Sequence, residues 1–337
     1  MSLPPLPVTV LSGFLGAGKT TLINHLLRST PGHRIGVLVN DFGSVGIDAQ
    51  LIVAEAKDVL TLSNGCICCS LRSDLGSQIM ALAESEDRPE HLLVEASGIS
   101  DPGAILSALL ELERYQAIRL DGVVTVIDVS EWQQLDPEAA QLAKRQLLAA
   151  DLLVLGKADL VLPQDLEAVS TAIAELSPAK QVVAEYGEVP IPVILGLEDG
   201  EARAIERDPN RTLPPIEHLP ASEWATWRFR THRPVGFKAL VATLKALPAG
   251  IYRGKGFLHL VERPGDRLLL HLSGRRVQIR TVGRWNDVTP CSELVLIGRP
   301  DAVDPDALAV RFDTCLGHRV EAGEPPPRSL GWTHSRD

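Results

Sequence analysis

The chain has 337 residues, of which 45% are hydrophobic and 23% charged, and its formal net charge is −10 at pH 7. This composition is typical of folded globular proteins and excludes disordered and collagen-like chains, while the length favours one large domain plus a smaller one. The acidic balance argues against a surface devoted to nucleic acid, because phosphate binding needs clustered positive charge.

The chain shows no signal for export or membrane insertion. Residues 1–5 carry no basic residue of the kind that opens a secretory signal. No apolar run reaches the ~18 to 20 residues of a membrane-spanning helix. We therefore expect a cytoplasmic protein with no membrane partner, in which cysteines serve metal or thiol chemistry better than disulfides.

The first half of the chain alternates short apolar runs with helical patterns. Runs bounded by polar or turn residues predict buried parallel strands, and strand-helix alternation predicts an α/β sheet covered by helices on both faces. The predicted strands are 8–11, 35–39, 92–94, 123–127, 152–155 and 181–184, and the predicted helices are 20–28, 71–83, 104–114, 138–150 and 164–176. The sequence thus indicates a P-loop NTPase type of domain with a mostly parallel sheet.

The second half has a different pattern. Between residues 199 and 224 the periodicity fails and four prolines break any element, which predicts a linker. Beyond it we predict strands at 227–230, 256–261, 268–272, 277–281 and 293–297 and a helix at 236–246, a small α+β domain with an antiparallel sheet. The predicted division is a nucleotide-binding domain at 1–198, a linker at 199–224, a C-terminal domain at 225–317 and a mobile tail at 318–337.

The clearest motif spans residues 13–20, which read Gly-Phe-Leu-Gly-Ala-Gly-Lys-Thr between a predicted strand and a predicted helix. In the pattern G-x-x-x-x-G-K-[ST], glycines let backbone N–H groups turn toward phosphate oxygens, and the helix N-terminus adds positive charge. Lys19 is expected to neutralise charge between the β and γ phosphates, and the Thr20 hydroxyl to ligate Mg²⁺. A glycine turn that binds nothing is the alternative. The predicted nucleotide-binding residues here are Gly13, Gly16, Ala17, Gly18, Lys19, Thr20 and Thr21.

A second motif, Glu95-Ala96-Ser97-Gly98, follows the predicted strand 92–94. Hydrolases with a phosphate loop use a carboxylate at the end of another buried strand on the Mg²⁺ side, directly or through water, and we predict Glu95 in that role. Gly98 stands where its backbone N–H can sense the γ-phosphate. Taken alone, a Glu after an apolar run is more often only a strand end, so this prediction depends on the phosphate loop.

A third motif concerns the base. Residues 156–159 read Gly-Lys-Ala-Asp and resemble the [NT]-K-x-D guanine motif, in which the carboxylate accepts hydrogen bonds from guanine N1 and N2. We predict GTP as the nucleotide, with Lys157 packing along the base and Asp159 reading it. Gly156 lacks the side-chain contact of the motif, and an ordinary solvent-facing turn is the alternative.

Three cysteines crowd into Gly65-Cys66-Ile67-Cys68-Cys69. Thiols this close invite oxidation unless they have a role, and thiolate is a soft donor that prefers Zn²⁺, Cu(I) or Fe–S iron. A C-x-C pair can direct two sulfurs toward one ion, whereas adjacent Cys68 and Cys69 tend to point apart. At most two of Cys66, Cys68 and Cys69 are therefore expected on one ion, and the alternative is that they are small buried apolar residues.

Taken together these motifs resemble the CobW family. Besides the phosphate loop, the resemblance rests on Asn40-Asp41-Phe42-Gly43 with Gly46-Ile47-Asp48, on Asn64 to Cys69, on Glu95 to Gly98 with Asp101-Pro102, and on Arg253 to Phe257. It covers residues 7–317. The family resembles the HypB and UreG metal-handling GTPases and includes zinc metallochaperones.

The resemblance implies a GTPase that slowly hydrolyses GTP to GDP and delivers a transition metal, Zn²⁺ or Co²⁺, to a client metalloprotein. Two departures concern the metal site: carboxylates flank the Asn-Glu-Phe-Gly segment in several members, whereas Val39 and Ser44 stand there in this chain, and Asp41 replaces the Glu. Tetrahedral zinc wants about four donors. The others must then be further cysteines, water, a nearby carboxylate or a second subunit, as in a metal-dependent homodimer.

Coupling between nucleotide and metal is our hypothesis for the mechanism. Asp41 and its neighbours would form a switch beside the γ-phosphate, and the ordering of this switch would alter the spacing of the thiols. Asp41 is expected to position the attacking water, and a turn-forming Asp is the alternative. Two other readings stay open: a small-molecule kinase built on the same loop, and a metal-binding or redox protein without nucleotide coupling.

The C-terminal region is more basic than the rest of the chain. Its cations usually form a solvated sheet face, and docking to an acidic client or to the acidic nucleotide-binding domain is the interpretation that we prefer. Because aromatic residues are interspersed, base stacking on nucleic acid is the alternative. The aromatic residues concerned are Trp224, Trp227, Phe237, Tyr252, Phe257 and Trp285.

Overall fold

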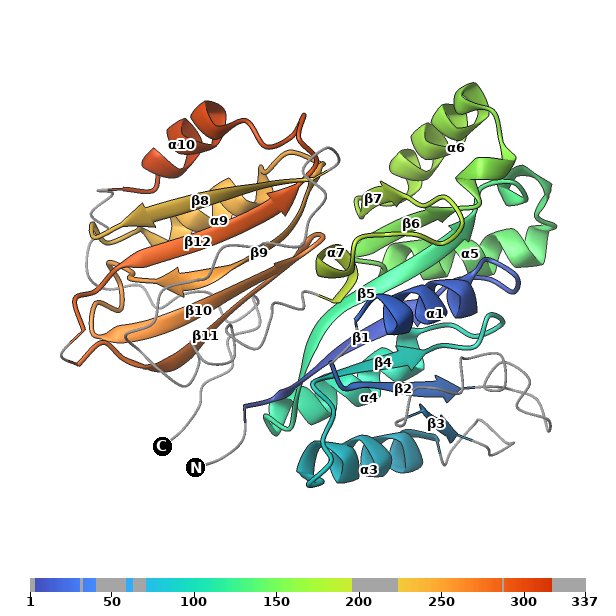
Figure 1. The fold of residues 1–337 in the computed structure, drawn as a ribbon, viewed down its shortest axis with the longest axis horizontal. Helices are drawn as coiled ribbons and strands as arrows, with labels where there is room; N and C mark the ends of the chain where they lie inside the picture. Colours follow the sequence, from blue (N-terminus) through green and yellow to red (C-terminus); the bar gives the residue numbers. More distant parts are fainter. Residues whose placement is uncertain are drawn as a thin grey trace. The chain divides into compact units, whose positions relative to one another are not determined.

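The computed structural model describes residues 4–30, 33–40, 59–62, 71–195, 224–286 and 288–316 (Figure 1). The chain divides into two compact units, Met1–Leu195 and Gly196–Asp337. Among the helices of the described ranges, none is long and apolar enough to cross a bilayer.

The first unit is built on a parallel sheet of seven strands in the order β3-β2-β4-β1-β5-β6-β7. Its strands are β1 (Leu6–Ser12), β2 (Ile35–Asn40), β3 (Val59–Leu62), β4 (His91–Glu95), β5 (Ile118–Asp128), β6 (Leu152–Gly156) and β7 (Lys180–Val183). The described residues of β4 and β6 are buried throughout, which is why these strands read as continuous apolar runs. The predicted α/β class is confirmed.

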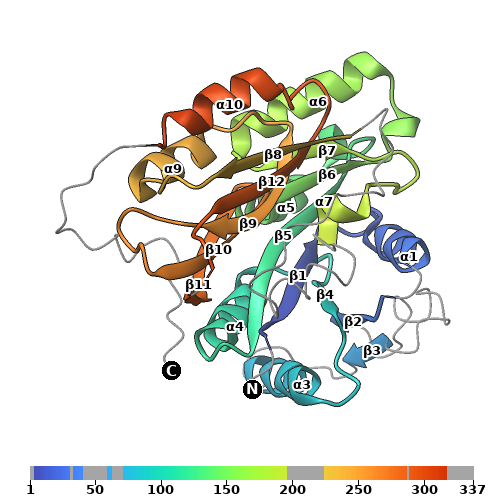
Figure 2. The same cartoon turned by 60° about the vertical axis from the view of Figure 1, so that its left-hand side comes forward.

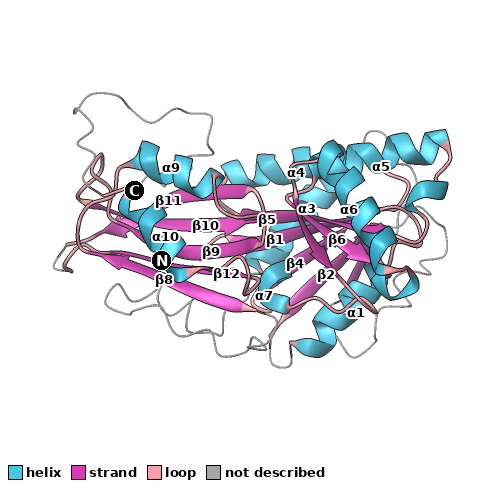
Figure 3. Ribbon diagram, turned by 90° about the horizontal axis from the view of Figure 1, so that it is seen from above, coloured by secondary structure: helices cyan, strands magenta, loops and turns pink. Residues whose placement is uncertain are grey.

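Helices cover both faces of this sheet. They are α1 (Lys19–Ser29), α3 (Leu71–Glu84), α4 (Gly103–Arg114), α5 (Pro137–Ala149), α6 (Pro163–Leu176) and α7 (Ile191–Leu195). Apolar side chains of α3 and α4 form one core cluster with β1, β4 and β5, and those of α5 and α6 form another with β5 and β6. Figure 3 shows these four helices on one face and α1 with α7 on the other. The carboxyl ends of the strands are thus left open at one edge, where parallel sheets bind ligands.

The second unit is an antiparallel sheet of five strands in the order β11-β10-β9-β12-β8. Its elements are β8 (Ala225–Thr231), α9 (Phe237–Lys245), β9 (Ile251–Leu258), β10 (Asp266–Ser273), β11 (Arg276–Arg284), β12 (Ser292–Gly298) and α10 (Pro305–Asp313). Side chains of α9 and α10 enter one apolar cluster with the sheet, so both helices cover the same face (Figure 2). The predicted α+β character is confirmed.

Four elements differ from the prediction. β3, α7 and α10 were not predicted, and the strand placed at 256–261 runs instead over Ile251–Leu258. Its glycines lie inside β9 where the chain approaches β12 closely: a Cβ on Gly256 would overlap the main-chain carbonyl of Glu293. Glycine here serves strand packing and not a turn.

The aromatic side chains of this unit are largely buried. Trp224 is 8% exposed and lies 5.6 Å from Tyr252 between ring centroids, while Phe257 and Trp285 are 4% and 5% exposed. The guanidinium of Arg267 stands 3.8 Å from the centre of the Phe257 ring, a cation–π contact that stabilises the core. Buried rings cannot stack bases, so five of the six aromatic residues named above give the nucleic-acid alternative no support. The sixth, Trp227, is partly buried and packs against Phe229 and Phe312.

The Lys180 ammonium is expected to make the stability of the first unit depend on pH. Burial at the start of β7 lowers its pKa from 10.5 to about 8. Since the folded chain then holds its proton less tightly than the unfolded chain, the cost to stability is fully present below pH 8 and is relieved as the pH rises toward 10.5. Lys180→Met should raise the free energy of unfolding by about 2 kcal/mol at pH 7 and by much less at pH 10.

Denaturant unfolding of the variant and the wild type at both pH values measures this effect. Lys144→Met on α5 is the control. The Lys144 ammonium is exposed, so its removal relieves no cost of burial and should not stabilise the fold. A stabilisation by Lys180→Met that is the same at pH 7 and pH 10 would contradict the proposed cause.

Candidate nucleotide-binding site

The loop between β1 and α1 has a conformation that requires glycine. Gly13, Gly16 and Gly18 have φ values of +137°, +71° and +101°, the left-handed region that side chains disfavour. A Cβ on Gly13 would also overlap the main-chain oxygen of Val126 on the neighbouring strand β5. Gly18 directly precedes α1, so the loop delivers the chain to the helix N-terminus, where unpaired N–H groups attract anions.

Lys19 is the first residue of α1, and its side chain turns back into this loop. Its side chain is 7% exposed, and Nζ donates to the main-chain oxygens of Gly13, at 3.0 Å, and Phe14, at 3.1 Å. Ala17 is 2% exposed and Thr20 is partly buried in the first turn of α1. The backbone of the loop therefore surrounds the Lys19 ammonium group. A bound anion would meet this positive charge inside the loop.

Glu95 and Gly98, which the sequence singled out, lie beside the loop. Glu95 ends β4 in register with Leu11 of β1 and is 3% exposed. A Cβ on Gly98 would stand 2.8 Å from the backbone nitrogen of Leu15 in the loop, so only glycine allows this close approach. The structure thus brings the loop, a buried carboxylate and the Gly98 backbone to one edge of the sheet.

The candidate base-reading residues follow β6. Lys157 has a φ of +59°, and its Nζ donates to Asp128 Oδ2 at 2.6 Å. Asp159 Oδ1 accepts a hydrogen bond of 3.1 Å from the backbone N–H of Tyr186, in the loop after β7. The polar ends of three neighbouring strands, β5, β6 and β7, therefore converge next to the phosphate loop.

Sequence reasoning missed Asp128. Burial raises the pKa of its carboxyl, but hydrogen bonds from Lys157 and Ser130 outweigh this effect, so the pKa lies below its ordinary value and the group is ionised at neutral pH. The sequence did contain a signal: Asp128 directly follows the predicted strand 123–127, just as Glu95 follows the predicted strand 92–94. Asp128 holds the Lys157 ammonium, leaving the aliphatic stem of Lys157 as the part that can pack along a base.

Gly156, where the guanine motif has Asn or Thr, lies against the phosphate loop. A Cβ at this position would stand 3.4 Å from the main-chain oxygens of both Ala17 and Ile127, an ordinary van der Waals contact. The structure therefore shows no steric reason for the glycine at this position.

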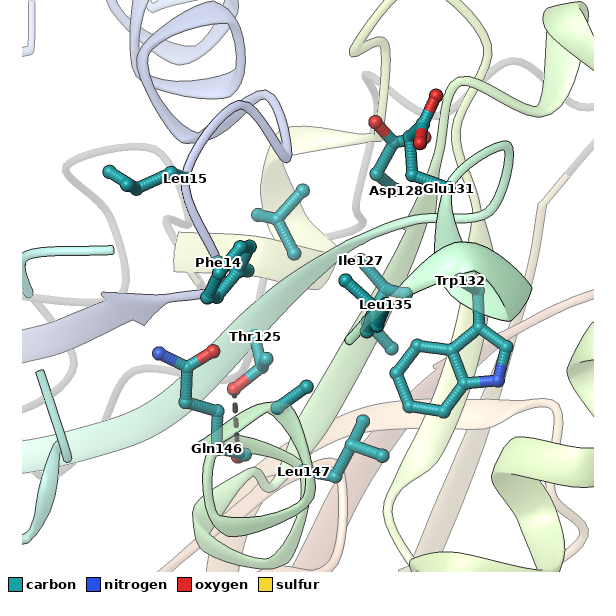
Figure 4. A pocket seen from close by; sticks show the side chains of 12 residues that line it. Phe14, Leu15, Thr125, Ile127, Asp128, Glu131, Trp132, Leu135, Gln146 and Leu147 are labelled. Carbon is teal, nitrogen blue, oxygen red and sulfur yellow. Dashed lines mark hydrogen bonds between the residues drawn. The ribbon is translucent and has the colours of Figure 1, made fainter. Parts of the chain in front are cut away.

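A cavity of about 230 Å³ lies beside the phosphate loop (Figure 4). Its walls come from the loop, from β5, from the segment between β5 and α5, and from α5 itself. The lining is largely apolar, with Gln146 as a polar side chain that reaches into it from α5. The lining residues used below are Phe14, Leu15, Thr125 and Gln146.

The predicted metal-side residues Asp41, Cys66, Cys68 and Cys69 lie outside the described residues. The strands that lead into them are described: β2 ends at Asn40 in register with Leu62, the last residue of β3. Within the described ranges, no group of three or more His, Cys, Asp or Glu side chains could hold a metal ion. Of the predicted linker only Trp224 is described, and the predicted domain boundaries and tail stay predictions.

Comparison with known proteins adds relatives to this geometry. The model described as "CobW/HypB/UreG, nucleotide-binding domain" matches residues 7–184, and "Cobalamin synthesis protein cobW C-terminal domain" matches residues 224–316. The "Zinc chaperone CobW" of Sinorhizobium sp is 32% identical over 91% of this chain and 95% of its own length, and its namesake in Pseudomonas aeruginosa is 32% identical over 94% and 92%. Among solved structures, Zn(II)-bound YjiA GTPase from E. coli is 24% identical over 94% of this chain and 100% of its own, with a TM-score of 0.43.

The nucleotide-binding model covers more than half of the chain, and the first of these relatives aligns along nearly all of it. The resemblance read from the phosphate loop and the cysteine motif is thereby confirmed. The chain belongs to the CobW/HypB/UreG family of nucleotide-binding proteins.

Proposed function

We propose that this chain is a GTPase metallochaperone, which binds GTP, hydrolyses it slowly to GDP and carries a transition metal, zinc in the first place, to a client metalloprotein in the cytoplasm. The observation that carries the proposal is the glycine loop curled around Lys19 with Glu95 and Gly98 against it. Relatives aligned along nearly the whole chain are named zinc chaperones, which supports zinc as the cargo.

Phosphate binding follows from the loop. Its backbone N–H groups and the Lys19 ammonium face the β and γ phosphates, and the Gly98 N–H approaches the γ-phosphate from the neighbouring segment. The Thr20 hydroxyl and the buried Glu95 carboxylate are hard oxygen donors, which fit Mg²⁺. When bound, this ion neutralises charge that develops between the β and γ phosphates. Asp41 positions the attacking water in this proposal.

Guanine recognition rests on Asp159. Its Oδ1 is fixed by the Tyr186 N–H, which orients the carboxylate toward donors at the edge of a base. Lys157, held by Asp128, provides an aliphatic stem along the base plane. Adenine presents a donor and acceptor pattern that does not match the carboxylate, so GTP is preferred over ATP.

Removing the carboxylate is expected to weaken this preference. Asp159→Ala should lower the ratio of kcat/KM for GTP to that for ATP by about 10- to 30-fold, because hydrogen bonds from guanine to a charged acceptor are lost. Steady-state phosphate release with each nucleotide measures the ratio. Asp165→Ala, which removes an exposed carboxylate from α6, serves as the control and should leave the ratio unchanged. An unchanged ratio in Asp159→Ala would assign the selectivity elsewhere.

Metal carriage is proposed for the cysteine motif, with Cys66, Cys68 and Cys69 as thiolate donors and Co²⁺ as a second ion of matching preference. The described strands support coupling to the nucleotide. Asn40 and Leu62 are paired neighbours at the carboxyl edge, and the switch residue Asp41 and the cysteine motif follow from these two strand ends. Ordering of one segment by a γ-phosphate can then change the spacing of donors in the other. A metal-dependent homodimer would supply donors that Val39 and Ser44 cannot.

Metal titration tests the coupling directly. Zn²⁺ affinity is measured on nucleotide-free, GDP-loaded and GTP-analogue-loaded protein. Phosphate released from GTP is measured separately without any acceptor molecule, which distinguishes hydrolysis from the transfer that a kinase would catalyse. A coupling in the usual range would separate the GDP and GTP-analogue affinities by roughly 5- to 150-fold. Equal affinities in the three states would contradict the switch, although hydrolysis itself could still be present.

A further inference from the structure

Helix α5 carries a buried amide beneath the segment that follows Glu95. Gln146 is 1% exposed, and its Nε2 donates to the main-chain oxygens of Ser100, at 3.2 Å, and Gly98, at 3.4 Å. Carbonyl oxygens only accept hydrogen bonds, so it is the amide nitrogen that faces them, and one side chain occupies both. The adjacent Arg145 forms an exposed ion pair with Asp101 at 3.2 Å between Nε and Oδ2.

The carbonyl oxygens held by Gln146 flank Ile99, which is 50% exposed. Gly98 itself has no side chain that could be packed, and glycine is the residue with the most backbone freedom. Its position against Leu15 of the phosphate loop must therefore be fixed through its main chain. Among the described side-chain hydrogen bonds, the one that reaches the Gly98 main chain is that of Gln146.

Gln146 is in turn fixed to the sheet. Thr125 Oγ1, on β5, donates to the main-chain oxygen of Gln146 at 3.2 Å, and Figure 4 shows the Gln146 side chain extending from α5 toward Phe14 of the phosphate loop. The amide thus lies between α5 on one side and the phosphate loop and the Gly98 segment on the other. These two segments would surround a γ-phosphate. A buried amide placed this way transmits the position of the helix to the Gly98 peptide.

We propose that Gln146 is a positioning residue for hydrolysis: it holds the Gly98 segment so that the Gly98 N–H faces the γ-phosphate, and it thereby raises both kcat and the preference for triphosphate over diphosphate. The inference rests on the proposed GTPase function. GDP lacks the γ-phosphate and gains nothing from this placement, so GDP affinity should be nearly independent of the amide.

Two variants of the side chain test the proposal. Gln146→Leu keeps the volume but removes the side-chain donor from the buried Gly98 carbonyl and the partly buried Ser100 carbonyl. We expect kcat and the affinity for a non-hydrolysable GTP analogue to fall about tenfold each while GDP affinity stays within about twofold. Gln146→Met, which is unbranched and adapts to the same space, gives the same comparison if Gln146→Leu does not fold.

Gln146→Glu separates positioning from packing. An ionised carboxylate repels the two carbonyls, whereas the protonated form donates one hydrogen bond, and burial raises the pKa of such a group. The activity of Gln146→Glu relative to wild type should therefore rise as the pH falls toward 5.5, which a packing defect would not produce. Arg145→Ala is the matched control, since it removes an exposed contact of the same helix without touching the amide; it should keep the wild-type ratio of analogue to GDP affinity.

Each outcome decides the proposal. Equal losses of GDP and analogue affinity in Gln146→Leu, or a flat relative pH profile in Gln146→Glu, would overturn it. Wild-type protein that releases no phosphate from GTP would instead overturn the proposed function. In that case the affinity ratio, which needs no turnover, still reports whether Gln146 distinguishes the two nucleotides.

Discussion

Lys19→Ala is expected to lower kcat for GTP hydrolysis by about 100-fold or more, the usual cost of removing a preorganised charge from a developing oxyanion. The Lys19 ammonium already lies inside the loop, where it donates to the main-chain oxygens of Gly13 and Phe14. The variant lacks both the charge and the two hydrogen bonds that curl the loop. Single-turnover phosphate release and the affinities for GDP and a GTP analogue measure the effect.

The control for this variant is Lys144→Ala, which removes an exposed ammonium from α5. Its turnover and affinities should equal those of the wild type. Preserved turnover in Lys19→Ala would show that the glycine loop is not the site of hydrolysis, and it would remove the GTPase half of the proposal while leaving metal binding to be judged separately.

Replacing Cys66 and Cys68 should lower the affinity for Zn²⁺ by a factor similar to the loss of kcat in Lys19→Ala. The double variant Cys66→Ala, Cys68→Ala is expected to weaken Zn²⁺ binding by at least about 100-fold. Zinc prefers soft thiolate ligands to water, and the variant removes two of these ligands. Competition with a chromophoric chelator measures the affinity. Co²⁺ substitution adds an optical readout, because thiolate-to-cobalt charge transfer disappears with the sulfurs.

Cys291→Ser provides the control for thiol content. This cysteine lies in the second unit, is partly exposed and is free. Zinc affinity should be unchanged in Cys291→Ser, and GTP hydrolysis without metal should be unchanged in the double variant. Tight zinc binding that survives loss of both Cys66 and Cys68 would place the cargo site elsewhere on the chain.

Most of the fold could be read from periodicity, and the exceptions have physical causes. β4 and β6 are buried throughout and appear as apolar runs, so their positions were predicted to within one or two residues. β3 has only four residues and was missed, whereas the equally short β7 was predicted because it continues the alternation of strands and helices. In β9, charges and glycines obscured a strand whose glycines are required by the nearby backbone of β12, a tertiary constraint that no local pattern contains.

For the candidate site, sequence reasoning proposed residues that belong to a motif and passed over residues whose place depends on long-range contacts. Lys19, Glu95 and Gly98 stand at fixed offsets from strand ends and were predicted. Asp128 and Gln146 contribute through contacts with segments 29 and 48 residues away in the chain. Such contacts become visible only once the parallel order of the strands brings those segments together.

The place of β3 at the border of the sheet has an evolutionary consequence. Among the strands that the structure describes, β3 has one neighbour and four paired positions, whereas β1, which leads into the glycine loop, is held by a partner on either side. Substitutions next to this border strand disturb fewer paired residues than substitutions in β1 would, so the segment that follows β3 can change in evolution at less cost to the glycine loop.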